Sequence, residues 1–311
     1  MPVKPIGGTQ IVNNYLHEHL DLDGFAIWPT TFDGKEVDPN VINIYHQHLE
    51  ASLQDMTKVF TEDRMETMDA LVFISHWQYE DFLINFPWLD ASKCHVIKNA
   101  TSTFPEPNKS TDGKLKAIYT STPFRGLKLM PEIWKRLDRE DIELDVYSSL
   151  EIYGKNFADK VRENHGSEFD DLFEELDSIP GINYKGYVTN KEVKQACLDA
   201  HLYLYPSIIM ETSCLSLMEA MAGGCAAVYT NIGALSETGS EYGYPSLMSF
   251  DDDKLIDNFV KKTNFVCDNY WTQPVQEKLK RQLSFYRENY SWEVRLKEWE
   301  ALLKDLKKLK E

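Results

Sequence analysis

Apolar runs of strand length alternate with segments of helical apolar spacing along most of this 311-residue chain. Parallel strands need a crossover segment between them, so this alternation predicts parallel β-sheets with helices on both faces. The expected strands are residues 25–31, 41–46, 70–75, 95–98, 115–120, 144–147, 182–184, 202–205 and 226–230. The expected helices are residues 10–20, 49–60, 78–85, 129–137, 169–176, 190–200, 214–222 and 292–309.

A polar segment interrupts the alternation at residues 105–113, where two prolines and a glycine occur with almost no apolar residues. The chain is also longer than one hydrophobic core usually supports. We therefore predict an α/β protein with two doubly wound, Rossmann-like domains, residues 1–104 and 105–289, and a closing helix, residues 290–311, that crosses back to the first domain. Open α/β sheets bind ligands beyond the carboxyl ends of their strands, so both sheets are expected to face one cleft.

The charge and cysteine content exclude several classes of partner. The formal net charge is −17, and residues 1–104 hold 6 lysines and arginines against 15 aspartates and glutamates. Nucleic acids and anionic membranes bind cationic surfaces, so we expect no nucleic-acid partner and no strong binding to anionic membranes. No apolar run is long enough to span a bilayer, and we expect no secretion leader. Five cysteines without a CxxC pair predict reduced thiols in a cytoplasmic compartment, and argue against a disulfide framework or zinc site.

The segment 202–224 carries the strongest chemical signal. A buried strand ends at Pro206, and a helix with Thr212 or Ser213 as its N-cap runs to Gly223. Glu211 then lies just before the helix N-terminus and Glu219 about two turns along it. Two glutamates at this spacing arise readily by chance in an acidic chain, so the weight lies on the whole arrangement of strand, turn and helix.

Free amides at such a helix start, together with the positive end of the helix dipole, can bind a diphosphate. The amides in question belong to Ser213, Cys214 and Leu215. Glu219 can accept hydrogen bonds from a ribose diol. Glu211 can hold a sugar hydroxyl or face the charge that develops at an anomeric carbon.

This segment, read as an apolar strand, Pro-Ser, Glu211, seven residues and Glu219-Ala-Met-Ala-Gly-Gly, resembles the E-x7-E signature of retaining glycosyltransferases of the GT-B fold, especially family 4. The resemblance is good over residues 115–300 and looser before. It implies transfer of a hexose from a UDP- or GDP-sugar to a glycan or other small hydroxyl acceptor, with retention of anomeric configuration and Glu211 as a catalytic residue.

Three further stretches resemble the same family. Ile182-Asn-Tyr-Lys-Gly-Tyr-Val188 is similar to the strand and turn that read the donor base, which implies donor contacts at Tyr187 and Val188. Asn231-Ile-Gly-Ala-Leu-Ser-Glu237 resembles the family's Gly-rich turn that ends in Glu. Residues 290–293 resemble the point where the chain crosses back to the first domain.

The resemblance also implies a charge clamp on the donor diphosphate. Arg125-Gly126 matches the family's Lys-Gly position, whereas Ser121 and Thr122 stand where relatives carry an earlier Arg. Arg125, helped by Lys128, is the expected clamp. Two cations and helix amides can replace a metal, and no Asp-x-Asp lies where a metal-dependent sugar site would need it. We expect no metal and no cofactor, and interpret residues 251–253 as a solvated helix start.

The start of the chain departs from the family pattern. Gly7-Gly8 resembles the paired-glycine loop whose amides approach the donor phosphate, which implies a donor contact at Gly8. Relatives have a full strand before this loop, whereas Met1-Pro-Val-Lys-Pro-Ile6 is too short and too rich in proline for a central strand. A reduced first domain is therefore expected.

Histidines end two of the expected strands. His46 and His48 share one side of a continued strand, where relatives often carry a cleft histidine near the sugar's 6-hydroxyl. His46 is the favoured catalytic candidate. His48 and His76 are acceptor-side candidates, and no third ligand that would make a metal site of the histidine pair is identified.

Two alternatives to a transferase stay open on the sequence. One is a GT-B-fold nucleotide-sugar epimerase, which would convert the donor without any acceptor. The other is a non-catalytic module that binds a nucleotide-sugar or glycan, which the short first domain makes plausible.

Overall fold

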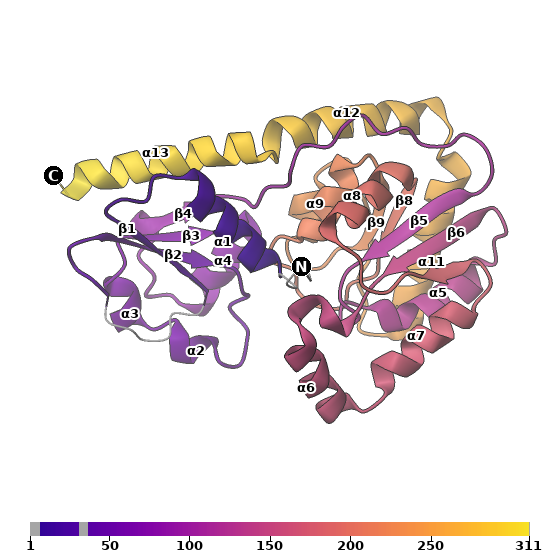
Figure 1. Cartoon of the computed structure of the whole chain (residues 1–311), viewed down its shortest axis with the longest axis horizontal. Coiled ribbons are helices and arrows are strands. Elements are labelled where there is room, and N and C mark those ends of the chain that lie inside the picture. Colours follow the sequence, from indigo (N-terminus) through magenta and orange to yellow (C-terminus); the bar gives the residue numbers. More distant parts are fainter. Residues whose placement is uncertain (1–6, 31–36, 311) are drawn as a thin grey trace.

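A four-stranded parallel sheet in the order β1-β2-β3-β4 forms the core of the first domain (Figure 1). The computed structural model describes residues 7–30 and 37–310. The strands are β1 (Phe25–Pro29), β2 (Ile42–Gln47), β3 (Ala70–Phe73) and β4 (Cys94–Val96). The helices are α1 (Gly8–His19), α2 (Met56–Val59), α3 (Glu62–Glu66), α4 (His76–Asn85) and the 3₁₀ turn η1 (Ala91–Lys93).

Successive residues of β2 and β3 point to opposite faces of this sheet, and every residue of both strands is buried. Ile44 and Val72 pack with α1 and with the C-terminal helix α13 (Trp292–Lys310), whereas Tyr45 and Phe73 pack with α2 and α4. Burial on both faces is the general condition of parallel sheets, and it explains the continuous apolar runs in the sequence.

The second domain holds a six-stranded parallel sheet in the order β10-β9-β8-β5-β6-β7. Its strands are β5 (Leu115–Thr120), β6 (Ile142–Tyr147), β7 (Ile182–Tyr184), β8 (Leu202–Tyr205), β9 (Ala226–Thr230) and β10 (Tyr244–Ser246). The strand order reverses between β5 and β8, which pair in the register Ile118↔Tyr203. In a doubly wound sheet, this switch point is where ligands bind.

Helices cover both faces of the larger sheet (Figure 1). They are η2 (Leu127–Leu129), α5 (Met130–Leu137), η3 (Leu150–Tyr153), α6 (Lys155–His165), α7 (Glu168–Ser178), α8 (Asn190–Asp199), α9 (Leu215–Ala222), α10 (Leu235–Gly239), α11 (Asp252–Asn269) and α12 (Gln273–Asn289). None of the helices within residues 7–30 and 37–310 is long and apolar enough to cross a membrane.

Most of the expected elements occur, and β7, β8 and β9 have the predicted bounds. The long helix expected at residues 49–60 is wrong, because only α2 forms there. Two side chains of α4 hold this segment in turns instead: Gln78 donates to the Leu49 carbonyl, and Asp81 accepts from the Ala51 amide. The proline-rich stretch Met1–Ile6, on which the expectation of a reduced first domain was based, lies outside the described residues.

The helix α13 crosses back onto the first domain, and the linker runs along α12 (Figure 1). The Thr101 amide donates to the Tyr290 carbonyl at 2.9 Å, so the two strands of chain that join the domains lie side by side. The apolar face of α13 then packs against α1, β2 and β3 through buried side chains, namely Trp292, Trp299, Leu302, Leu303 and Leu306. This helix therefore belongs to the core of the first domain, although it is the last in sequence.

One lysine fastens the linker to the second domain. The Lys109 ammonium donates to the carbonyls of Cys197, Leu198 and Ala200 at the end of α8, and to that of Gly223 at the end of α9. Helix C-termini carry unpaired carbonyls and a partial negative charge, so one ammonium satisfies two of them together. The polar segment that separates the two cores is thus anchored near its middle.

We expect Lys109→Met to lower the free energy of unfolding by about 2–3 kcal/mol, because it leaves several partly buried carbonyls without a donor. The measurement is urea unfolding followed by circular dichroism. Lys114→Met, at an exposed position directly after the linker, is the matched control and is expected to change stability by less than about 0.5 kcal/mol. Equal effects of the two substitutions would contradict the anchoring role.

Candidate active site

Two glycines bring the loops after β5 and β9 against the loop after β8, next to the switch point. Gly126 has φ +87°, and a Cβ there would lie 1.9 Å from the Pro206 carbonyl oxygen. Gly233 has φ +57°, and its Cβ would lie 2.5 Å from the Glu211 carbonyl oxygen. Only glycine fits both the close approach and the left-handed backbone. The first glycine places Arg125 against the loop after β8, and the second supports the backbone of Glu211.

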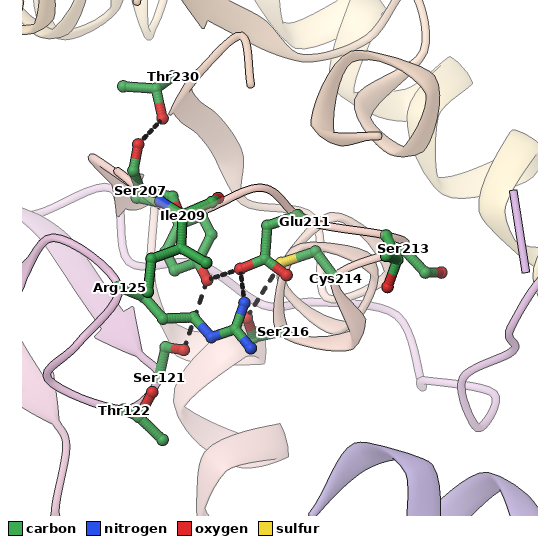
Figure 2. Close-up of polar contacts among 12 residues, drawn as sticks. Ser121, Thr122, Arg125, Ser207, Ile209, Glu211, Ser213, Cys214, Ser216 and Thr230 are labelled. Atoms are coloured by element: carbon green, nitrogen blue, oxygen red, sulfur yellow. Dashed lines mark hydrogen bonds and ion pairs between the residues drawn. The ribbon is translucent and has the colours of Figure 1, made fainter. Parts of the chain in front are cut away.

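Arg125 and Glu211 form an ion pair where these loops meet (Figure 2). The Glu211 side chain is 7% exposed, and its Oε1 accepts from both the Arg125 guanidinium and the Tyr205 hydroxyl, the latter at 2.5 Å. Burial alone would lower the pKa of Arg125, but Glu211 raises it above its ordinary value. Arg125 is therefore charged at neutral pH, and Glu211 Oε2 makes no hydrogen bond within the described chain.

The helix α9 starts beside this pair without a side-chain cap. The expected N-cap at Thr212 or Ser213 is wrong, because Cys214 occupies that position with φ 62° and makes no capping hydrogen bond. The Thr212 hydroxyl instead donates to the His48 carbonyl of the first domain at 2.8 Å. The first amides of α9 therefore remain available to an anion, at the positive end of the helix dipole.

Glu219 lies one turn further along α9 and is half-buried. Burial raises the pKa of its carboxyl to about 7, although the nearby Lys194 charge opposes this shift. A carboxylate that is costly to ionise in the free protein is a group that gains from polar hydrogens brought by a ligand.

A cavity of about 1120 Å³ extends along these groups and is lined by both domains. The first domain contributes the start of α1, where a Cβ on Gly8 would lie 3.1 Å from the Leu215 side chain. Most of the residues predicted for the site line this cavity: Gly8, His48, Arg125, Tyr187, Val188, Glu211, Ser213, Cys214, Leu215 and Glu219. Residues far apart in sequence are thus brought to one cleft of a size that accommodates a nucleotide-sugar.

The structure does not place His46 at the cavity. Its ring lies behind His48, with the two ring nitrogens 3.3 Å apart, and packs edge-on against Trp299 of α13 at 5.0 Å between centroids. Burial lowers the pKa of His46 well below its usual range and that of His48 to about 3, so both rings are neutral at pH 7. β2 ends at Gln47. Of the two histidines, only His48, just beyond the strand, lines the cavity.

Two other candidates also lie away from the cavity. Lys128 is exposed on η2, because the turn that buries Leu127 and Leu129 points it to solvent. His76 is exposed at the start of α4, where its ring nitrogen Nδ1 lies 3.0 Å from a Glu237 carboxylate oxygen. Neither side chain is positioned in this structure to contact a ligand bound between the domains.

Glu237 joins the two domains, a role that the sequence alone did not assign to it. Its carboxylate, on α10 of the second domain, accepts from the backbone amides of His76 and Trp77 at the start of α4, and from Lys98 at 2.8 Å. Burial would raise the pKa of Glu237, but these hydrogen bonds lower it to about 2. The family resemblance marked this glutamate as the end of a Gly-rich turn, but its partner helix is more than 150 positions away. Within the described residues, no cluster of three or more His, Cys, Asp or Glu side chains is arranged to hold a metal ion.

Two parallel α/β domains with a ligand-sized cavity at the switch point of the second define the GT-B class of glycosyltransferase fold. The chain belongs to the group 1 glycosyl transferases, whose family model matches residues 106–281. The matched region contains Arg125, Glu211 and Glu219, whereas the first domain lies outside it.

Solved structures of low sequence identity share the fold over nearly the whole chain. A glycosyltransferase from Rickettsia africae is 14% identical, with a TM-score of 0.71 over 98% of this chain and 84% of that one. The Anabaena protein HepE, solved with UDP-glucose, is 12% identical, with a TM-score of 0.64 over 85% and 72%. The pneumococcal O-GlcNAc transferase GtfA, solved with UDP and GlcNAc, is 16% identical, with a TM-score of 0.62 over 96% and 60%. Comparison with curated protein sequences gives no match.

Proposed function

We propose that this glycosyltransferase moves a hexose from a UDP- or GDP-sugar to a hydroxyl of a glycan or small acceptor, with retention of anomeric configuration. The observation that carries the proposal is the meeting of Arg125, Glu211 and the uncapped start of α9 at one switch point, with Glu219 on the same helix. The complexes of HepE with UDP-glucose and of GtfA with UDP make UDP-sugars the first donors to test.

In this proposal, the diphosphate lies at the start of α9. Its charge is met by the first amides of that helix and by the guanidinium nitrogens of Arg125 that Glu211 does not occupy. The amides of Gly8 and its neighbours at the start of α1 approach from the first domain. We propose that these groups, rather than a metal ion, stabilise the diphosphate as it leaves.

The reaction itself exchanges one bond at the anomeric carbon for another. The bond from this carbon to the β-phosphate oxygen breaks as the acceptor oxygen bonds the same face, and the acceptor proton passes to the departing diphosphate. Glu211 Oε2 faces the positive charge that develops on the sugar, and preorganised charges of this kind are the largest contribution in many enzymes. His48 lines the same cavity as a neutral ring and can hydrogen-bond a sugar or acceptor hydroxyl.

A thermal-shift panel tests the donor proposal. A ligand that binds only the folded state at 100 times its Kd adds about 2.7 kcal/mol of stability and so raises the melting temperature. We expect UDP or GDP to raise it more than the matching monophosphate, because the site is proposed to bind both phosphates. Donor consumption in a screen of acceptors, with the product anomer assigned by NMR, then tests transfer and retention. Chelation of metals is expected to leave the rate unchanged.

Three results of this screen would contradict the proposal. A product of inverted configuration would remove the retaining mechanism. Conversion of the donor to an epimer without acceptor would indicate the epimerase alternative, and nucleotide binding without turnover under any acceptor would indicate a non-catalytic module.

A further inference from the structure

One lysine, Lys194, is among the residues that line the cavity, and no role has yet been given to it. Lys194 lies in the second turn of α8, the helix that follows Tyr187 and Val188. Its side chain is half-buried. Helices α8 and α9 pack side by side (Figure 1). Lys194 on α8 and Glu219 on α9 both line the cavity. The Lys194 ammonium donates to the hydroxyl of Ser102, just before the linker.

Two of the three hydrogen-bond donors of the Lys194 ammonium have no acceptor among the residues that the structure describes. Within residues 7–30 and 37–310, no carboxylate lies within ion-pair distance of its ammonium, and the bond to Ser102 is its one hydrogen bond. Arg125, by contrast, is paired with Glu211, and Lys128 points away from the cavity. An unpaired, half-buried ammonium in a chain of net charge −17 retains donors for a ligand.

Lys194 and Arg125 interact electrostatically with different groups, which indicates that Lys194 lies away from the proposed diphosphate region. Its charge acts on the carboxyl of Glu219, opposing the rise in the pKa of that group, whereas the groups that act most on Arg125 are Glu211, Tyr205 and Cys214. Glu219 lies four residues after Leu215, which is a rise of about 6 Å along the helix axis. Lys194 and Glu219 therefore form a pair of opposite charges away from the start of α9, on the side of the base-reading segment.

The chemistry of this pair fits a vicinal diol. Each hydroxyl of a ribose donates one hydrogen bond and accepts others, whereas a carboxylate only accepts and an ammonium only donates. A diol placed between them can satisfy both groups at once, with charge-assisted hydrogen bonds on either side. A phosphate would be repelled by Glu219, and a base carbonyl would leave the carboxylate without a donor.

We propose that Lys194 is a ribose-binding residue, whose ammonium donates to a hydroxyl oxygen of the donor's 2′,3′-diol while Glu219 accepts from the diol, so that the site selects ribonucleotides over deoxynucleotides. The inference rests on the proposed function, since it requires a nucleotide in this cavity. It assigns to α8 a specificity that the family pattern does not carry.

The test compares UDP with 2′-deoxy-UDP and 3′-deoxy-UDP on the full-length chain by isothermal titration calorimetry. GDP and its deoxy forms replace them if GDP gives the larger thermal shift. We expect the wild type to bind the ribonucleotide at least tenfold more tightly than one of the deoxy forms. Lys194→Met is expected to weaken the ribonucleotide about tenfold and that deoxy form less than threefold, so the preference collapses. Lys194→Arg is expected to keep part of the preference.

Ser102→Ala is the matched control, because it removes the partner of Lys194 in the free protein and leaves the ammonium in place. We expect it to keep the preference for the ribonucleotide. If Lys194→Met weakens all three nucleotides by the same factor, the lysine has only a structural role and the inference is overturned, while the proposed function stands. If the wild type binds none of these nucleotides, both fail.

Discussion

Arg125→Ala is expected to reduce kcat/KM for sugar transfer by two to three orders of magnitude, on the order of what the loss of one preorganised charge costs other enzymes. The substitution removes the guanidinium proposed to hold the leaving diphosphate. It also leaves the Glu211 carboxylate, which is 7% exposed, with only the Tyr205 hydroxyl as a partner. We expect the free energy of unfolding to fall by about 3 kcal/mol, the lower end for a broken buried ion pair, because Arg125 is itself 30% exposed.

A second variant separates the two effects. Glu211→Gln keeps the shape of the side chain but removes its charge. A double variant with Arg125→Ala and Glu211→Gln therefore has no unpaired carboxylate buried in the site. The double variant is expected to recover most of the stability lost in Arg125→Ala and none of the activity. Urea unfolding and initial transfer rates, measured on all four proteins, form a double-mutant cycle.

Lys128→Ala is the control, since it removes an exposed cation from the turn next to Arg125. It is expected to change neither kcat/KM nor the equilibrium constant of unfolding by more than about twofold, as is usual for an exposed position. Full transfer activity in both Arg125→Ala and Glu211→Gln would show that the site assignment is wrong. Activity lost in step with stability in every variant would show that the pair only holds the loops together.

Glu219→Gln is expected to stabilise the free protein and weaken donor binding. The pKa of Glu219 rises from its ordinary 4.5 to about 7 in the folded state. Between these values the folded state binds more protons than the unfolded state, so the wild type loses stability as pH rises from 4.5 to 7. Glutamine does not ionise and avoids this loss, which we place at about 2 kcal/mol at pH 8 after allowing for partial exposure.

The measurement is unfolding by urea at pH 5 and pH 8 for wild type and variant. We expect the variant to gain stability relative to the wild type at pH 8 and to be near it at pH 5. Nucleotide affinity should show the opposite dependence: the wild type loses affinity below pH 7 as its carboxylate is protonated, whereas the variant binds about tenfold more weakly at pH 8 with little dependence on pH. Stability bought at the expense of binding is a common pattern at functional sites.

Glu163→Gln, at an exposed position on α6, is the matched control and is expected to show neither effect. If Glu219→Gln is destabilised at pH 8, the carboxylate must be held by favourable contacts and its raised pKa is refuted. If it binds the nucleotide as tightly as the wild type, Glu219 does not contact the ribose.

Local sequence pattern predicted the parts of this fold that depend on short-range periodicity. β5, β7, β8 and β9 were found at their predicted bounds because each is a short, mainly apolar run that ends at a turn or a polar residue. Residues 49–60 have apolar spacing that suits a helix, yet Gln78 and Asp81, some 30 positions later, bond their backbone and hold turns there. A pattern within one segment carries no information about partners from another.

The same distinction applies to the site. The place of Glu211, Glu219 and Arg125 at the cavity could be predicted, because the strand, turn and helix start around them are contiguous in sequence and resemble the family pattern. The choice between His46 and His48 could not, because it depends on where β2 ends and on Trp299 of α13 covering one of the two rings. Lys194 gave no signal, since a lysine on an amphipathic helix is usually a solvated side chain.

The sequence by itself determined the alternation of strands and helices, the linker between two cores, and the charged residues that end the strands of the second domain. These follow from hydrophobic periodicity and turn chemistry, which act over a few residues. Tertiary structure alone decided which of these residues share the cavity, how Glu237 joins the domains and which charges are paired. Those outcomes depend on burial and on contacts between distant segments, which exist only once both sheets and the crossing helix α13 have packed.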